Sequence, residues 1–201
     1  MSISTYAELQ TAVGNWLKRS DFTSSIPDLI MLGEKWIFRH ARTRDMETAF
    51  SVTISSGVAA LPSDYVAMKQ AYIDGTPITN LQPKAASWIL LRYPSRQAAD
   101  IPKFFAQDGS NLIFGPYPAS AYTVKGTYYK RLTSVQSSAN ALFVANPDLY
   151  LFAALAEAEL FIKNDKRTAI WTAKRDEILR DVNGEDKAAM FSGGPLAMVA
   201  T

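Results

Sequence analysis

Residues 146–165 constrain the fold of this chain more than any other stretch. They read Asn-Pro-Asp-Leu-Tyr-Leu-Phe-Ala-Ala-Leu-Ala-Glu-Ala-Glu-Leu-Phe-Ile-Lys-Asn-Asp. Asn146 and Pro147 are typical of a helix N-cap and of the first helical position, so the sequence predicts a helix that begins here. Residues 149–162 are apolar except for two glutamates, whereas a surface helix has one apolar stripe. This helix must be covered on several sides, either by the chain's own elements or by a neighbouring subunit.

The two exceptions, Glu157 and Glu159, are two residues apart and therefore point to different sides of the helix. Two carboxylates in so short an apolar run argue against a membrane span. Each needs a hydrogen-bonding or basic partner if it is buried. We take four residues of this helix as candidates for a subunit interface: Leu151, Leu155, Glu157 and Glu159.

Helical periodicity occurs near both ends of the chain, and strand periodicity lies between them. Residues 4–42 place apolar residues at helical spacing in two segments, and a further helical pattern runs from Asp165 to the stop signal Asn183-Gly184. Residues 48–132 alternate apolar and polar positions around tight turns such as Asp108-Gly109. These patterns predict an α+β fold with a helical bundle from residues 1–45 and 146–184, a β-rich insertion over 46–145, and an extended C-terminal tail over 185–201.

Two aromatic pairs in the insertion put one ring on each face of a strand. They are Phe104-Phe105 and Tyr128-Tyr129. We expect one face of each strand to belong to a sheet core. The other face is then either covered by the chain or shared with a partner.

The charge pattern excludes several classes of function. The chain has 21 Lys+Arg and 19 Asp+Glu, with the two signs interspersed, so sequence-directed nucleic-acid binding is not expected. The absence of cysteine excludes disulfides and thiolate metal sites and is consistent with a reducing compartment. Residues 1–9 lack a basic region followed by an apolar one, so we expect no signal peptide, a cytosolic origin and no membrane partner.

The sequence offers no pattern for catalysis, a cofactor or a metal ion. His40 is the only histidine, and it follows Arg39 at a predicted helix end, where a structural role is expected. Neither a phosphate-binding glycine loop nor an acidic metal-binding loop is present. A small cell-wall hydrolase would need two carboxylates facing each other across a cleft, such as Asp64 and Asp100, and the sequence does not place them together.

Two further stretches are candidate contact sites. The densest basic cluster contains Arg39, Arg42 and Arg44. One interpretation is that these cations contact DNA phosphates or an acidic partner surface. The other is that they only complement the dipole of a helix C-terminus. In the tail, Gly193-Gly-Pro195 argues against a helix, yet several residues are more apolar than a solvated end requires. The tail is either a disordered end or docks on a partner, and the candidates for docking are Phe191, Leu196, Met198 and Val199.

A combination of motifs along residues 3–182 resembles a known family. Besides the opening helical hairpin, these motifs are Leu61-Pro-Ser-Asp-Tyr65, Asp108-Gly-Ser-Asn-Leu-Ile-Phe-Gly-Pro-Tyr-Pro118, Val124-Lys-Gly-Thr-Tyr-Tyr-Lys-Arg-Leu-Thr133 and residues 146–159. The chain resembles the head-to-tail adaptor, or connector, proteins of tailed bacteriophages, including the tail tubular adaptors of short-tailed phages.

This resemblance implies a structural virion protein without catalytic residues or cofactors. It implies a dodecameric ring at the head-tail interface, beneath the portal protein and matching its symmetry, assembled in the host cytoplasm. The ring would extend the DNA channel, touch genomic DNA non-specifically, and give a platform to the tail nozzle or other tail proteins; on this view, residues 191–199 would dock on the portal. The alternative is a β-rich module that binds a sugar or a cell-surface ligand through an exposed aromatic platform in residues 48–132.

Overall fold

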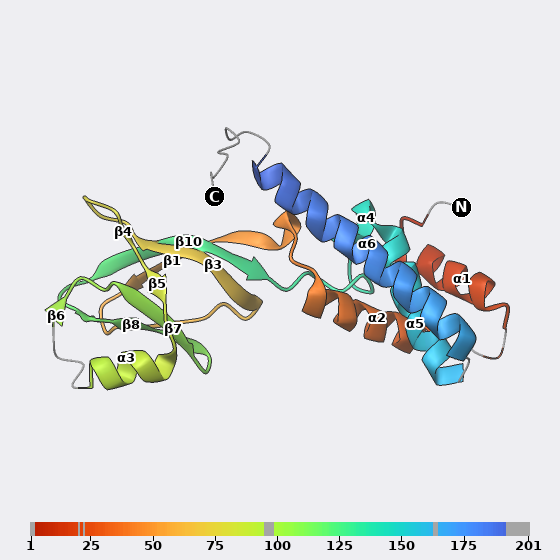
Figure 1. The fold of residues 1–201 in the computed structure, drawn as a ribbon, viewed down its shortest axis with the longest axis horizontal. Coiled ribbons are helices and arrows are strands. Elements are labelled where there is room, and N and C mark those ends of the chain that lie inside the picture. Colours follow the sequence, from red (N-terminus) through yellow and green to blue (C-terminus); the bar gives the residue numbers. More distant parts are fainter. Residues whose placement is uncertain (1–2, 20, 22, 95–98, 163–164, 192–201) are drawn as a thin grey trace, which may run out of the picture. The chain divides into compact units, whose positions relative to one another are not determined.

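The computed structural model describes residues 3–19, 21, 23–94, 99–162 and 165–191. Contacts between residues divide the chain into two compact units. We call residues 1–45 with 132–201 the helical unit, and residues 46–131 the β unit. The predicted α+β class is confirmed, with helices formed by both ends of the chain and sheets formed by the middle (Figure 1).

The helical unit is organised around α5 (Pro147–Ile162). This helix contacts every other helix of the unit, and Figure 1 shows it running alongside α6. Its neighbours are α1 (Tyr6–Leu17), α2 (Ile26–His40), α4 (Ala141–Ala145) and α6 (Asp165–Phe191). α1 begins with a capping box, because Thr5 Oγ1 accepts from Glu8 N at 3.2 Å and Glu8 Oε2 accepts from Thr5 N at 3.1 Å. The chain's own helices therefore cover α5 as far as its last turn.

The boundaries of the two units differ from the sequence-based ones in two places. Residues 132–145 belong to the helical unit, where Leu132 and Val135 are buried. In addition, α6 does not stop at Asn183-Gly184 but continues to Phe191. One glycine inside a helix costs only about 1 kcal/mol, and residues 185–190 are mostly good helix formers. The expected extended tail lies, from residue 192 onward, outside the described residues.

The described residues of the β unit form two four-stranded sheets and a two-stranded one. The first sheet has the order β1-β10-β3-β4, the second β2-β8-β7-β5, and the third pairs β6 with β9. β5 and β7 run parallel, whereas β1, β10 and β3 form an antiparallel run. The bounds of the strands are β1 (Glu47–Ile54), β2 (Val58–Ala60), β3 (Tyr65–Ile73), β4 (Thr79–Asn80), β5 (Gln82–Pro83), β6 (Ala99–Asp100), β7 (Phe104–Asp108), β8 (Asn111–Gly115), β9 (Tyr117–Pro118) and β10 (Tyr122–Lys130).

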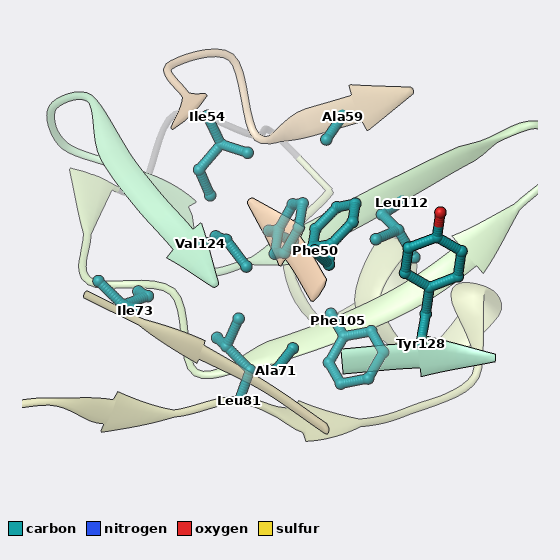
Figure 2. Close-up of a cluster of buried hydrophobic side chains, with 11 residues drawn as sticks. Phe50, Ile54, Ala59, Ala71, Ile73, Leu81, Phe105, Leu112, Val124 and Tyr128 are labelled. Atoms are coloured by element: carbon teal, nitrogen blue, oxygen red, sulfur yellow. The ribbon is translucent and has the colours of Figure 1, made fainter. Parts of the chain in front are cut away.

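One apolar core joins the two larger sheets. Figure 2 shows Phe50 and Ile54 of β1, Val124 of β10, and Phe105 and Leu112 of the other sheet among its side chains. The predicted alternation in β1 is confirmed. Phe50 and Ile54, four positions apart, are buried, and the residues next to them in the strand are more exposed. The β unit is thus a sandwich in which alternate residues of both sheets face inward.

The predicted hairpin at Asp108-Gly109 is also confirmed. Asp108 of β7 pairs with Asn111 of β8, which leaves a two-residue loop. Gly109 has φ +59°, a backbone conformation that favours glycine. The helix α3 (Ala86–Arg92) packs on β7 and β8 (Figure 1). In the described part of the chain, no helix is both long enough and apolar enough to cross a membrane.

Candidate interaction surfaces

The predicted interface residues of α5 belong mainly to the core of their own unit. Leu151 is 5% exposed and Leu155 is 1% exposed. Glu159 is only 2% exposed, and its Oε1 lies 3.7 Å from Arg167 Nη1 of α6. Glu157 is half-buried. The chain's own helices thus cover Leu151, Leu155 and Glu159. A role of these residues and of Glu157 in a subunit interface stays a prediction.

A glycine allows α2 to approach α5 closely. A Cβ atom on Gly33 would lie 2.8 Å from the backbone carbon of Ala153 and 2.9 Å from the backbone nitrogen of Ala154. Neither backbone atom can move without displacing α5. Gly33 is thus required for this helix-helix contact, and the small residues of α5 opposite it have the same role.

Glu34, next to this contact, is a buried carboxylate that anchors the return of the chain from the β unit. It is 4% exposed, and its two oxygens accept hydrogen bonds from Ser134 Oγ at 2.6 Å and Val135 N at 2.8 Å. Burial raises the pKa of the Glu34 carboxyl, and the bonds from Ser134 and Val135 partly oppose that rise. Sequence reasoning missed this residue, although its helical spacing with Ile30 and Ile37 placed it on the buried face.

The C-terminus of α2 is held by α6. Arg175 of α6 is buried, with its Cζ 3.5 Å from the centre of the Trp36 ring, and Trp36 stacks on His40 at 4.3 Å. His40 Nδ1 lies 2.8 Å from the carbonyl oxygen of Trp36. The single histidine is therefore part of a packed helix end, as its position in the sequence predicts.

The basic cluster lies on and just after this helix end. Arg39 Nε donates to Lys35 O at 3.2 Å, and Arg42 Nη1 donates to Phe38 O at 3.4 Å. All three arginines, Arg39, Arg42 and Arg44, are exposed. The structure thus places Arg39 and Arg42 on backbone carbonyls at a helix C-terminus, where the helix dipole favours cations.

Several large apolar side chains of the helical unit remain exposed. Leu160 and Phe161 lie in the last turn of α5, and Ile170 lies in the second turn of α6. Leu160 and Ile170 are both 60% exposed. Trp16 of α1 is edge-on to Phe152 at 5.7 Å and to Trp171 at 5.5 Å, so an aromatic cluster contributes to the exposed apolar surface. We use the name helical apolar surface for the exposed side chains of Trp16, Leu160, Phe161 and Ile170 taken together.

In the β unit, exposed apolar side chains gather on α3. Leu91 is 82% exposed, and Trp88 and Leu90 are also exposed. Phe104 points to this side of β7, where its ring centre lies 4.9 Å from that of Trp88. The outer face of the Phe104-Phe105 pair is therefore covered by the chain's own helix, while Phe105 belongs to the sheet core.

The two carboxylates that a hydrolase would need have separate structural partners. Asp64 Oδ1 accepts a hydrogen bond from Tyr128 Oη at 2.9 Å. Asp100 Oδ1 accepts from Ile101 N at 2.7 Å, and Asp100 Oδ2 lies 3.6 Å from Lys103 Nζ. Within the described residues, no group of three or more His, Cys, Asp or Glu side chains is arranged to hold a metal ion.

Three of the four residues proposed to dock the tail on a partner lie outside the described residues. Phe191 is the last residue of α6, and Leu196, Met198 and Val199 lie outside the described residues. Their role in docking stays a prediction.

Comparison with known proteins identifies the family. No curated protein matches the chain. The sequence model of the SU10 adaptor protein family matches residues 4–199, which is nearly the whole chain and includes both structural units. The resemblance to head-to-tail adaptors is thereby confirmed: the chain belongs to the SU10 adaptor protein family of bacteriophage structural proteins.

Proposed function

We propose that copies of this chain form a ring beneath the portal protein, extend the DNA channel and give the tail proteins a platform. The observation that carries this proposal is the family match over residues 4–199. Portal symmetry makes a dodecamer the expected assembly. The ring would form in the host cytoplasm and remain at the head-tail junction of the virion.

The helical apolar surface supports self-association. A ring requires a heterologous interface, in which one surface of a copy contacts a different surface of the next. Leu160, Phe161 and Ile170 expose apolar side chains at the end where α5 gives way to α6. Met31 and Leu32 of α2 and Val144 of α4 expose others, which a second side of the interface could use. Contacts between such surfaces would remove apolar area from water, which is the main driving force for association.

The charge distribution supports passage of DNA rather than its capture. The formal net charge is only +2, and the arginines Arg39 and Arg42 already bond to carbonyls of α2. Contacts with genomic DNA would then be few and non-specific. The proposed role needs neither catalysis nor a cofactor. For the tail segment we retain the proposal that Phe191, Leu196, Met198 and Val199 dock on the portal.

A β-rich module for sugars or cell-surface ligands is the second candidate. One observation favours it: Trp88 gives the β unit an exposed indole, 39% accessible. However, Lys84 Nζ lies 5.5 Å from the centre of that ring. A sugar stacking on this face of the indole would have to displace the ammonium group, so this candidate is the weaker of the two.

The ring interface can be tested by placing charges on the helical apolar surface. Leu160→Glu and Ile170→Glu together should leave the helical content and the melting temperature of the free chain nearly unchanged, because both side chains are exposed. Portal complexes prepared with this double variant should carry few adaptor copies. Ile78→Glu, at a position 63% exposed in the β unit, is the matched control and should give complexes like the wild type. Normal filling by the double variant would show that this surface is not the interface.

A further inference from the structure

The helix α3 leaves three large apolar side chains exposed, Trp88, Leu90 and Leu91. It has 7 residues, and Ile89 is its only fully buried side chain; this residue packs with Ala106 of β7 and Ile113 of β8. The opposite side of the helix presents Leu91, at 82% exposed, together with Leu90. Exposed large apolar side chains on a short surface helix add nothing to the stability of the isolated subunit. They become favourable when a partner covers them.

The charged residues of α3 and of the chain directly flanking it, residues 84–93, are all basic. Lys84 Nζ lies 5.8 Å from the centre of the Phe104 ring, and Arg92 Cζ lies 5.9 Å from the centre of the Tyr93 ring. Residues 84–93 read Lys-Ala-Ala-Ser-Trp-Ile-Leu-Leu-Arg-Tyr and contain no acidic residue. Two cations held against aromatic rings thus flank the exposed leucines, and a partner with carboxylates would complement them.

We propose that Lys84, Trp88, Leu90, Leu91 and Arg92, which we call the α3 surface, form the docking site for a tail protein. The partner segment inserts an apolar side chain beside Leu91 and Trp88 and places carboxylates near Lys84 and Arg92. This inference rests on the proposed function, because it assigns the tail-binding role of the adaptor to one surface of the β unit.

The chemistry of the surface favours a protein segment over a saccharide. Leu90 and Leu91 offer aliphatic area, whereas sugars are bound by open aromatic faces and neutral polar groups. An aromatic and aliphatic centre with cations at its edge is also the composition found at protein-protein contact sites. The cations should speed the encounter with an acidic partner, and the rate of joining should fall as salt screens them.

The test uses tailless heads that carry the full-length adaptor and a tail extract of the same phage. Heads are prepared with wild-type adaptor, Leu91→Ser, Lys84→Glu or the control Ile78→Ser, which removes an exposed apolar side chain elsewhere in the β unit. Adaptor content of the heads is measured first, by mass or by gel densitometry. The fraction of heads that gain tails is then counted in electron micrographs over a series of extract concentrations.

We expect all four preparations to contain the same amount of adaptor. Leu91→Ser and Lys84→Glu heads should need about tenfold more extract for half-maximal joining, whereas Ile78→Ser heads should behave as wild type. Joining of the wild-type heads should weaken with salt, and that of Lys84→Glu heads should depend on salt less.

Three results would overturn the inference. The first is joining at the wild-type level by both the Leu91→Ser and the Lys84→Glu heads. The second is loss of the variant adaptors from the heads, which would assign the α3 surface to the portal or the ring. The third is inhibition of joining by soluble cell-wall saccharides, which would assign the α3 surface to a glycan. Absence of the wild-type adaptor from portal-bearing heads would instead refute the proposed function itself.

Discussion

The side-chain amide of Asn183 in α6 bonds to the backbone of Arg42, just after the C-terminus of α2. Asn183 Oδ1 accepts a hydrogen bond from Arg42 N at 3.0 Å, and Asn183 Nδ2 donates to His40 O at 3.4 Å. Residues 141 positions apart in the chain therefore meet at one helix end. The residue that looked like a stop signal for its own helix is instead a cap for another one.

Asn183→Ala should destabilise the helical unit by about 1 kcal/mol, because it removes the acceptor for Arg42 N and the donor to His40 O. Urea unfolding followed by helical circular dichroism measures the change. Asn15→Ala, at an exposed position of α1, is the control and should be neutral or slightly stabilising, since alanine favours a helix. Equal stability of Asn183→Ala and the wild type would contradict the capping role.

Glu34 should make the helical unit less stable as pH rises. Burial raises the pKa of this carboxyl in the folded state above that of the unfolded state, which is about 4.3. Between the two pKa values the folded chain binds more protons, so the free energy of unfolding falls with increasing pH and levels off above the folded pKa.

Glu34→Gln removes that titration and keeps an oxygen that can accept from Val135 N. The difference in unfolding free energy, variant minus wild type, should therefore increase as the pH rises above the unfolded-state pKa of about 4.3, and should level off once the pH passes the folded-state pKa. Glu34→Ala is the control, and it should lose about 1–3 kcal/mol because Val135 N is left without an acceptor. A Gln variant whose difference from the wild type is the same at all pH values would refute this assignment.

Gly33→Ala and Gly14→Ala should change stability in opposite directions. A methyl group at position 33 collides with the backbone of Ala153 and Ala154, and overpacking of this kind costs about 1–3 kcal/mol. At position 14 the nearest atom is Ile26 Cδ1, at 3.4 Å, at the end of a flexible side chain. Gly14→Ala should therefore stabilise α1 by about 0.5–1 kcal/mol. Thermal unfolding of both variants decides the matter, and stabilisation by both would show that α2 and α5 are not in close contact.

Deletion of residues 192–201 should weaken attachment to the portal and leave the melting temperature nearly unchanged. The deletion removes Leu196, Met198 and Val199 but keeps α6 intact. Attachment is measured as the adaptor content of portal complexes at limiting protein concentration. A full-length variant with these three residues changed to serine shows whether attachment depends on their apolar side chains or on the length of the tail. If portal complexes contain as much of the deletion variant as of the wild type, residues 192–201 do not dock on the portal.

Local patterns in the sequence were sufficient to predict most elements of the fold. The periodicities of residues 4–42 and 48–132, and the Asp108-Gly109 hairpin, are properties of neighbouring residues, and the structure confirms them. Asp74-Gly75 is typical of a two-residue hairpin turn, but the structure differs from that expectation. Ile73 pairs with Thr79, so the loop is five residues long and includes Pro77, which has no N–H to donate to a strand partner.

The surfaces were harder to predict because they depend on contacts between distant residues. The apolar character of α5 was read correctly, but no local pattern shows whether α1, α2, α4 and α6 or a second subunit covers Leu155. The link from Glu34 to Val135 was missed because its acceptor and donor are 101 positions apart and residues 132–140 have no periodicity. The α3 surface was missed because exposure of Leu91 on a short helix is decided by the packing of Ile89.

We propose that this member of the SU10 adaptor family works as a ring on the portal. Native mass measurement of purified portal complexes, with and without the wild-type chain, tests it most directly. The mass should increase by that of many copies of the chain, with a dodecamer as the expected number, and saturation should give one discrete species. A single copy per portal, or no increase in mass, would contradict it.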